Sequence, residues 1–194
     1  MKKIKIDDVI YTPNLDFRIA IKCNNIADDE SINQFERPLA IIYLVFGDLG
    51  LDHPEHYEKL INWYMNYLKC GKEIEQQTGI PDMDYEEDKG LIISSFKYDY
   101  GSNPYNEEFL SWEEFYNDLN NLSNSELGNC CVLSRVRYYR NLDLRKIKDE
   151  KEREKARKIK NQWALKKYKK KPTKEQKESA KKFFNMLKGV DIDE

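Results

Sequence analysis

The two histidines of this chain stand three residues apart, and both have carboxylates as neighbours. His53 and His56 are about one helical turn apart, so with Asp52 or Glu55 they offer the ligand types and spacing for a divalent metal ion. The alternative interpretation is the exposed start of a helix, where acidic side chains suit the helix dipole and the histidines are incidental. Because no second ligand cluster accompanies the pair, we favour the second interpretation and expect no metal site.

Motifs typical of phosphate binding or nucleophilic catalysis are absent from the sequence. It contains no GxxxxGK[ST] or GxGxxG loop and no GxSxG turn. Acidic clusters such as "IADDE" and "YEED" fall where helices are expected to begin, and helix capping explains them. We therefore expect a protein that is not an enzyme and that uses no cofactor.

Charge is distributed very unevenly along the chain. Residues 1–134 hold 11 lysines and arginines against 25 aspartates and glutamates, a net charge of −14, whereas residues 135–188 hold 22 against 7, a net charge of +15. This pattern indicates an acidic body carrying a basic arm, and we expect such an arm to bind a partner. The composition changes abruptly near Leu144, so we expect two domains, 1–143 and 144–194.

The basic arm has two interpretations. Dense lysine and arginine with Trp163 and Tyr168 interleaved could bind phosphates by charge and bases by stacking. The acids of "DEKERE", at helical spacing among the bases, are instead typical of a helix stabilised in solvent or docked on a protein. We favour the protein partner and keep nucleic acid as the alternative. The candidate partner-binding residues are Arg145, Lys146, Lys148, Arg153, Arg157, Lys160, Trp163, Phe183, Phe184 and Leu187.

These residues must be positioned by helices. Glycine is scarce, charged residues make up 35% of the chain, and no segment longer than a few residues alternates with period two. The sequence therefore predicts an all-helical fold, with a compact helical body and a long basic C-terminal helical arm. The stretches expected to form helices are residues 14–29, 31–47, 52–71, 84–100, 111–122, 123–136, 149–171 (about 34 Å long) and 173–189.

The run "PLAIIYLVFG", Pro38 to Gly47, is the most apolar stretch. It is about half the length that a membrane span requires. Because it has no polar face, we expect a helix surrounded by other helices at the centre of the core. The expected hydrophobic centre consists of Leu39, Ile42, Phe46, Leu60, Tyr64, Phe96 and Trp112.

The sequence also favours a cytoplasmic location. "MKKIKIDDVIYTPN" has no sustained apolar region and no small-residue cleavage site, so it does not resemble a signal peptide. None of the four cysteines forms a CxxC pair, which is typical of reduced thiols.

Several segments, taken in order, are similar to one known family. They are "DFRIAIKCNNIADD", "FERPLAIIYLVFG", "NYLKCGKE", "SFKYDYG", "FLSWEEF" and "RNLDLRKIKDEKEREKARKIKNQWALKK". Together they resemble the bacteriophage gene-product-fifteen family of Gram-positive tailed phages and prophages, from about Asp16 to Lys167. Residues 172–194 have no counterpart in this resemblance.

The resemblance implies a small cytoplasmic helical protein that performs no covalent chemistry. Such a protein would act as a tail assembly chaperone, escorting the tape measure protein until tail-tube subunits replace it. The charge division of the chain also suits head-to-tail self-association, in which the arm of one subunit lies on the body of the next. We therefore expect the tape measure protein and a second copy as partners, with no membrane, and keep a nucleic-acid-binding accessory protein as the alternative.

Overall fold

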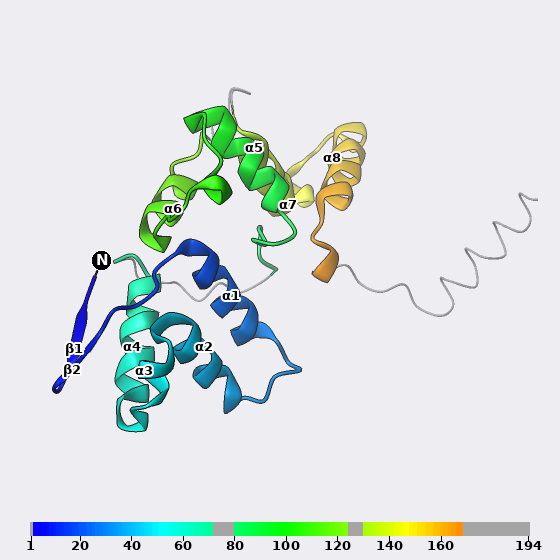
Figure 1. Cartoon of the computed structure of the whole chain (residues 1–194). Helices are drawn as coiled ribbons and strands as arrows, with labels where there is room; N and C mark the ends of the chain where they lie inside the picture. The colour runs from blue at the N-terminus through cyan, green and yellow to red at the C-terminus, as the bar shows by residue number, and fades with distance from the viewer. Residues whose placement is uncertain (1, 72–79, 124–129, 169–194) are drawn as a thin grey trace, which may run out of the picture. The chain divides into compact units, whose positions relative to one another are not determined.

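The computed structural model describes residues 2–71, 80–123 and 130–168 (Figure 1). Its contacts divide the chain into two units, Met1–Leu142 and Asp143–Glu194. We call these units the body and the arm. Independent folding of the body remains a prediction.

Most of the described residues are helical, as the sequence predicts. The body contains β1 (Ile4–Ile6), β2 (Val9–Tyr11), α1 (Phe17–Asp28), α2 (Glu36–Phe46), α3 (Asp48–Leu51), η1 (Pro54–His56), α4 (Tyr57–Leu68), α5 (Lys89–Tyr100), η2 (Pro104–Asn106), α6 (Trp112–Asn120) and α7 (Val132–Asn141). The described part of the arm contains η3 (Leu144–Lys146), α8 (Glu150–Trp163) and η4 (Lys166–Tyr168). Within these residues no helix has the length and apolar character needed to cross a membrane.

A small β-hairpin at the N-terminus is an addition to the all-helical prediction. β1 and β2 pair antiparallel, with Ile4 opposite Tyr11 and Ile6 opposite Val9. Asp7 takes a positive φ of 52° in the turn that joins the strands. Each strand has three residues, which is too short for period-two alternation to stand out in the sequence.

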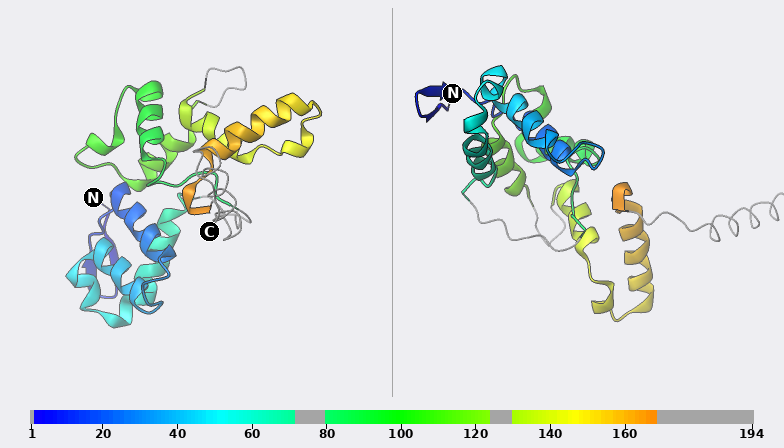
Figure 2. Two further views of the ribbon diagram at one scale, coloured as in Figure 1. Left: turned by 90° about the vertical axis from the view of Figure 1, so that its right-hand side faces the viewer. Right: turned by 90° about the horizontal axis from the view of Figure 1, so that it is seen from below.

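Two clusters of buried side chains form the core of the body. One joins α2 and α4 to β2, and the other joins α1 to α5, α6 and the start of α7. α1 contributes to both clusters, because Phe17 and Ile21 belong to the second and Cys23 to the first. Figures 1 and 2 show the corresponding groups, with α2, α3 and α4 in light blue to cyan and α5, α6 and α7 in green to yellow-green.

α2 is the predicted helix of the apolar run, but the helices among the described residues do not surround it. Ile42, Val45 and Phe46 are buried, whereas Leu39 and Tyr43 are exposed. The prediction of Leu39 as a core residue was therefore wrong. The other members of the predicted centre are buried, namely Ile42, Phe46, Leu60, Tyr64, Phe96 and Trp112.

Several helices begin at residues other than the predicted ones. α4 begins at Tyr57 after the short helix η1 and has no side-chain cap, so the predicted start at residue 52 was wrong. α5 begins at Lys89, because a turn closed by Asp84 occupies the residues before it. α7 begins at Val132 behind the Cys131 cap, and not at Ser123.

A buried ion pair joins the start of α5 to the end of α7. The Arg140 guanidinium donates to both carboxylate oxygens of Asp88, at 2.6 and 2.8 Å. The two side chains are 8% and 2% exposed. Asp88 also accepts from the backbone N–H of Asp84, and Arg140 donates to the Asp82 carbonyl. These bonds satisfy charges that would otherwise be costly to bury.

The arm helix is shorter than the predicted helix 149–171. α8 begins as expected, with the Asp149 side chain accepting from the Glu152 N–H, but it ends at Trp163 because Ala164 is extended. Its 14 residues span about 21 Å at 1.5 Å per residue. Leu165, which follows the break, is buried. Alanine is the best helix former, so no local signal marks this end. The predicted helix 173–189 lies outside the described residues.

Candidate functional site

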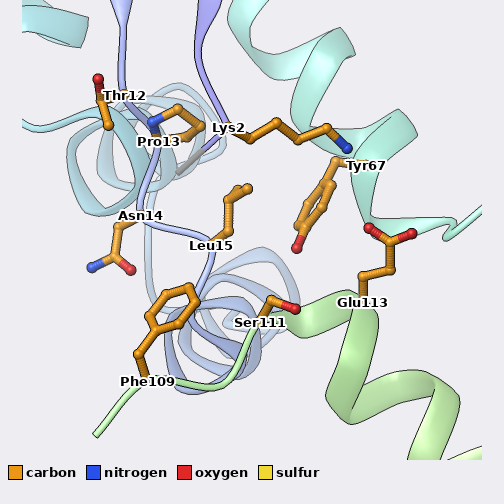
Figure 3. A pocket seen from close by; sticks show the side chains of 9 residues that line it. All are labelled: Lys2, Thr12, Pro13, Asn14, Leu15, Tyr67, Phe109, Ser111 and Glu113. Atoms are coloured by element: carbon orange, nitrogen blue, oxygen red, sulfur yellow. The ribbon is translucent and has the colours of Figure 1, made fainter.

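The body contains a pocket that opens to solvent, with a volume of about 710 Å³. It lies between the segment that follows β2, the last turn of α4 and the start of α6 (Figure 3). Its walls are formed by Lys2, Thr12, Pro13, Asn14, Leu15, Tyr67, Phe109, Ser111 and Glu113. None of these residues is among the partner-binding candidates predicted from the sequence.

Backbone hydrogen bonds hold the two extended walls of this pocket together. Phe17 N–H donates to the Leu110 carbonyl at 2.9 Å, and Trp112 N–H donates to the Leu15 carbonyl at 2.8 Å. These bonds form an isolated antiparallel bridge between Asp16 and Ser111. The walls therefore come from segments that are distant in the sequence, and no local pattern could have predicted the pocket.

The side chains of Asp16 and Arg18 fix the wall that carries Phe109. Asp16 caps α1 by accepting from the Arg18 N–H at 2.9 Å, and it accepts from the Arg18 guanidinium at 2.7 and 2.6 Å. The same guanidinium donates to the carbonyls of Glu107 and Glu108, at 3.1 and 2.9 Å. Burial acts to raise the pKa of Asp16, but hydrogen bonds from Arg18 and Leu110 outweigh it, and the pKa lies below its usual value.

The pocket combines apolar walls with a polar rim. Leu15, Pro13 and the largely exposed ring of Phe109 supply apolar surface, and Lys2 Nζ lies 5.3 Å from the centre of the Tyr67 ring. Burial raises the pKa of Tyr67, so its hydroxyl stays protonated at neutral pH. This surface suits an apolar side chain of a partner, with hydrogen bonds at the rim.

Ser111 in this pocket is engaged in capping. Its hydroxyl donates to Glu114 Oε2 at 2.7 Å and accepts from the Glu114 N–H, which forms a capping box at the start of α6. Neither histidine is among the residues that line the pocket. The Ser111 hydroxyl therefore serves the start of α6.

The histidine pair has a structural role. Ligand atoms of His53, Glu55 and His56 lie within 4.8 Å of one another. However, His56 Nδ1 bonds the Tyr11 hydroxyl at 2.7 Å, and its Nε2 lies 3.0 Å from Asp7 Oδ2. A metal ion on either nitrogen would replace a bond that ties the hairpin to the body. His56 is also buried, so the interpretation of an exposed helix start was wrong for this residue.

The structure separates the predicted arm residues into paired, exposed and half-buried groups. Arg145 lies 2.9 Å from Asp143 and, mainly by its hydrogen bonds, lowers the pKa of that carboxyl to about 2. Arg157 pairs with Glu154 at 2.9 Å. Lys146 and Lys148 are exposed. The half-buried residues are Arg153, Lys160 and Trp163, and the residues outside the described part are Phe183, Phe184 and Leu187.

Comparison with known proteins identifies one family. The model of a family described as "Bacteriophage Gp15 protein" matches residues 1–165, which include the whole body and α8. No curated protein and no solved structure matches the chain.

Proposed function

Because this chain belongs to the bacteriophage Gp15 protein family, we propose that it is a non-catalytic chaperone of phage tail assembly that binds the tape measure protein. The arm supplies the electrostatic part of this binding, and the body supplies apolar contacts. The proposal extends to a cytoplasmic location in the bacterial host, where phage tails are assembled.

The observation that carries the proposal is that side chains suited to binding a protein are exposed to solvent. Lys146 and Lys148 on the arm are exposed, and Phe109 on the body is exposed beside the pocket. The residues with the best chemistry for catalysis, Ser111 and His56, are engaged in bonds that hold the fold. Surfaces of this kind favour recognition of another protein over a reaction.

Co-expression with the tape measure protein of the same phage tests this function. The parent is expected to retain the tape measure through purification at high salt, with an absorbance ratio free of nucleic acid. At low salt, where exposed charges are least screened, Lys146→Glu with Lys148→Glu should weaken retention, because the exposed positive charges of the arm are reversed. A matched control, Lys5→Glu with Lys22→Glu, makes the same charge change at exposed positions of the body. If the parent does not retain the tape measure at low salt or at high salt, the proposal is refuted.

Nucleic-acid binding by the arm is the second candidate function. Tyr168 supports it, because its ring lies 5.9 Å from Lys167 Nζ and could stack on a base. The pairing of Arg145 and Arg157 with carboxylates of the same arm opposes it. This candidate would be favoured if the protein does not bind the tape measure but binds nucleic acid, and if the logarithm of the binding constant falls linearly with the logarithm of the salt concentration.

A further inference from the structure

The outward side of α2 and the residue before it carry an apolar strip, which we define as Phe35, Leu39 and Tyr43. These side chains are 75%, 38% and 52% exposed. They are spaced four residues apart, so they follow one another along one side of the helix. The other side of α2 is packed into the core through Ile42 and Val45. Contiguous apolar surface of this kind is typical of an interaction site.

The strip lies in an acidic part of the chain. Residues 28–48 contain five carboxylates, Asp28, Asp29, Glu30, Glu36 and Asp48, and all five residues are exposed. The one basic residue in this range is Arg37. Its guanidinium donates to the carbonyls of Ile32 and Ala27, at 3.0 and 3.1 Å, and so is held against its own loop. A partner segment that is both apolar and positively charged fits this surface.

The chain itself contains a segment with these properties. Residues 173–189 lie outside the described residues, and their sequence has five lysines against two glutamates. Phe183, Phe184 and Leu187 recur in it at helical spacing. Its charge is opposite to that of residues 28–48, and its apolar side chains could cover those of the strip.

We propose that the strip on α2 binds residues 173–189 of a second copy of this chain. The two contact surfaces belong to different parts of the molecule, so the contact is head-to-tail and can propagate into a ring or an open chain. This inference goes beyond tape-measure binding and does not depend on it.

Light scattering on full-length protein tests the contact with three pairs of substitutions. The strip variant is Leu39→Ser with Tyr43→Ser, and the tail variant is Phe183→Ser with Phe184→Ser. Each should weaken self-association by about 10-fold or more, because each removes apolar side chains from the centre of the contact. The matched control, Tyr98→Ser with Tyr138→Ser, removes two exposed aromatic rings elsewhere on the body and should associate like the parent. Circular dichroism checks that every variant is folded.

A mixing experiment separates head-to-tail association from other arrangements. The strip variant keeps an intact tail, and the tail variant keeps an intact strip. Mixed at a concentration at which each alone is monomeric, they should form a complex of two 23.2 kDa chains and nothing larger. A mixture that stays monomeric would overturn the proposal, as would a strip variant that associates like the parent. A parent that is monomeric at every concentration and yet retains the tape measure would overturn this inference and leave the proposed function standing.

Discussion

Asp16 is the residue whose replacement most directly tests how the body holds its pocket. Asp16→Ala removes the cap of α1, which contributes about 1 kcal/mol. It also removes charge-assisted bonds between the 9% exposed Asp16 side chain and Arg18, which contribute about 1–2 kcal/mol more. Arg18 keeps its bonds to Glu107 and Glu108 and is one third exposed, so no fully buried charge is left without a partner. The free energy of unfolding should therefore fall by about 2–3 kcal/mol, which lowers Tm by roughly 4–12 °C.

Urea unfolding followed by circular dichroism measures this loss, and two variants isolate its parts. Asp16→Asn keeps a capping oxygen and loses the charge, so it should cost about 1–2 kcal/mol. Ser111→Ala removes the α6 cap alone and should cost about 1 kcal/mol. If Asp16→Ala proves no more destabilising than Ser111→Ala, the Asp16–Arg18 pair does not hold the wall and our reasoning is wrong.

The same pair predicts a pH dependence. The pKa of Asp16 is lower in the folded protein than in the unfolded chain, so the unfolded chain takes up the proton first as the pH falls. Asp16 contributes fully to the free energy of unfolding above its pKa in the unfolded chain, which is about 4. This contribution is lost as the pH falls through the pKa of Asp16 in the folded protein. The stability difference between the parent and Asp16→Asn should therefore narrow below about pH 4. A difference that stays constant down to pH 2 would contradict this account.

Three further changes test the body and its boundary. Ile42→Asp should cost about 4 kcal/mol or more in a thermal melt because it buries a charge, whereas Leu39→Asp on the exposed strip should cost under about 1 kcal/mol. Arg140→Met should cost about 3–5 kcal/mol in urea unfolding because Asp88 loses its buried partner, and adding Asp88→Leu should recover part of that loss. Deletion of residues 144–194 should leave a folded, helical body by circular dichroism, and a loss of helicity throughout the remainder would show that the arm is needed for the core.

Local patterns in the sequence predicted the features that depend on local chemistry. The capping box of Ser111 and Glu114 is made of short-range hydrogen bonds, so the spacing of a serine and a glutamate is enough to indicate it. The start of the arm helix near Asp149 was also predicted correctly. The apolar run was correctly assigned to a helix, because its length and the glycine at its end constrain it. The family was identified from segments distributed along the chain, and the family match over residues 1–165 confirms it.

The features that sequence patterns missed depend on contacts between distant residues. The burial of His56 follows from bonds to Tyr11 and Asp7, which lie in the hairpin. The pocket exists because the segment before α1 pairs with the segment before α6. The exposure of Leu39 could not be read from α2 alone, since no charged residue occurs from Pro38 to Phe46 and only the packing decides which side is buried.

The bridge between Asp16 and Ser111 also affects the order in which the body can form during synthesis. Asp16 accepts a hydrogen bond from Leu110, 94 residues later in the chain, whereas the cluster around Ile42 is complete once Leu68 has been made. At 5–20 residues per second, the ribosome needs roughly 2–10 s to make the 47 residues from Lys69 to Phe115. During that interval the first cluster can form while Phe17 and Ile21 on α1 still lack their partners on α5 and α6. A nascent chain stalled within this interval should therefore expose apolar surface to chaperones of the host, and release of the stall should remove it.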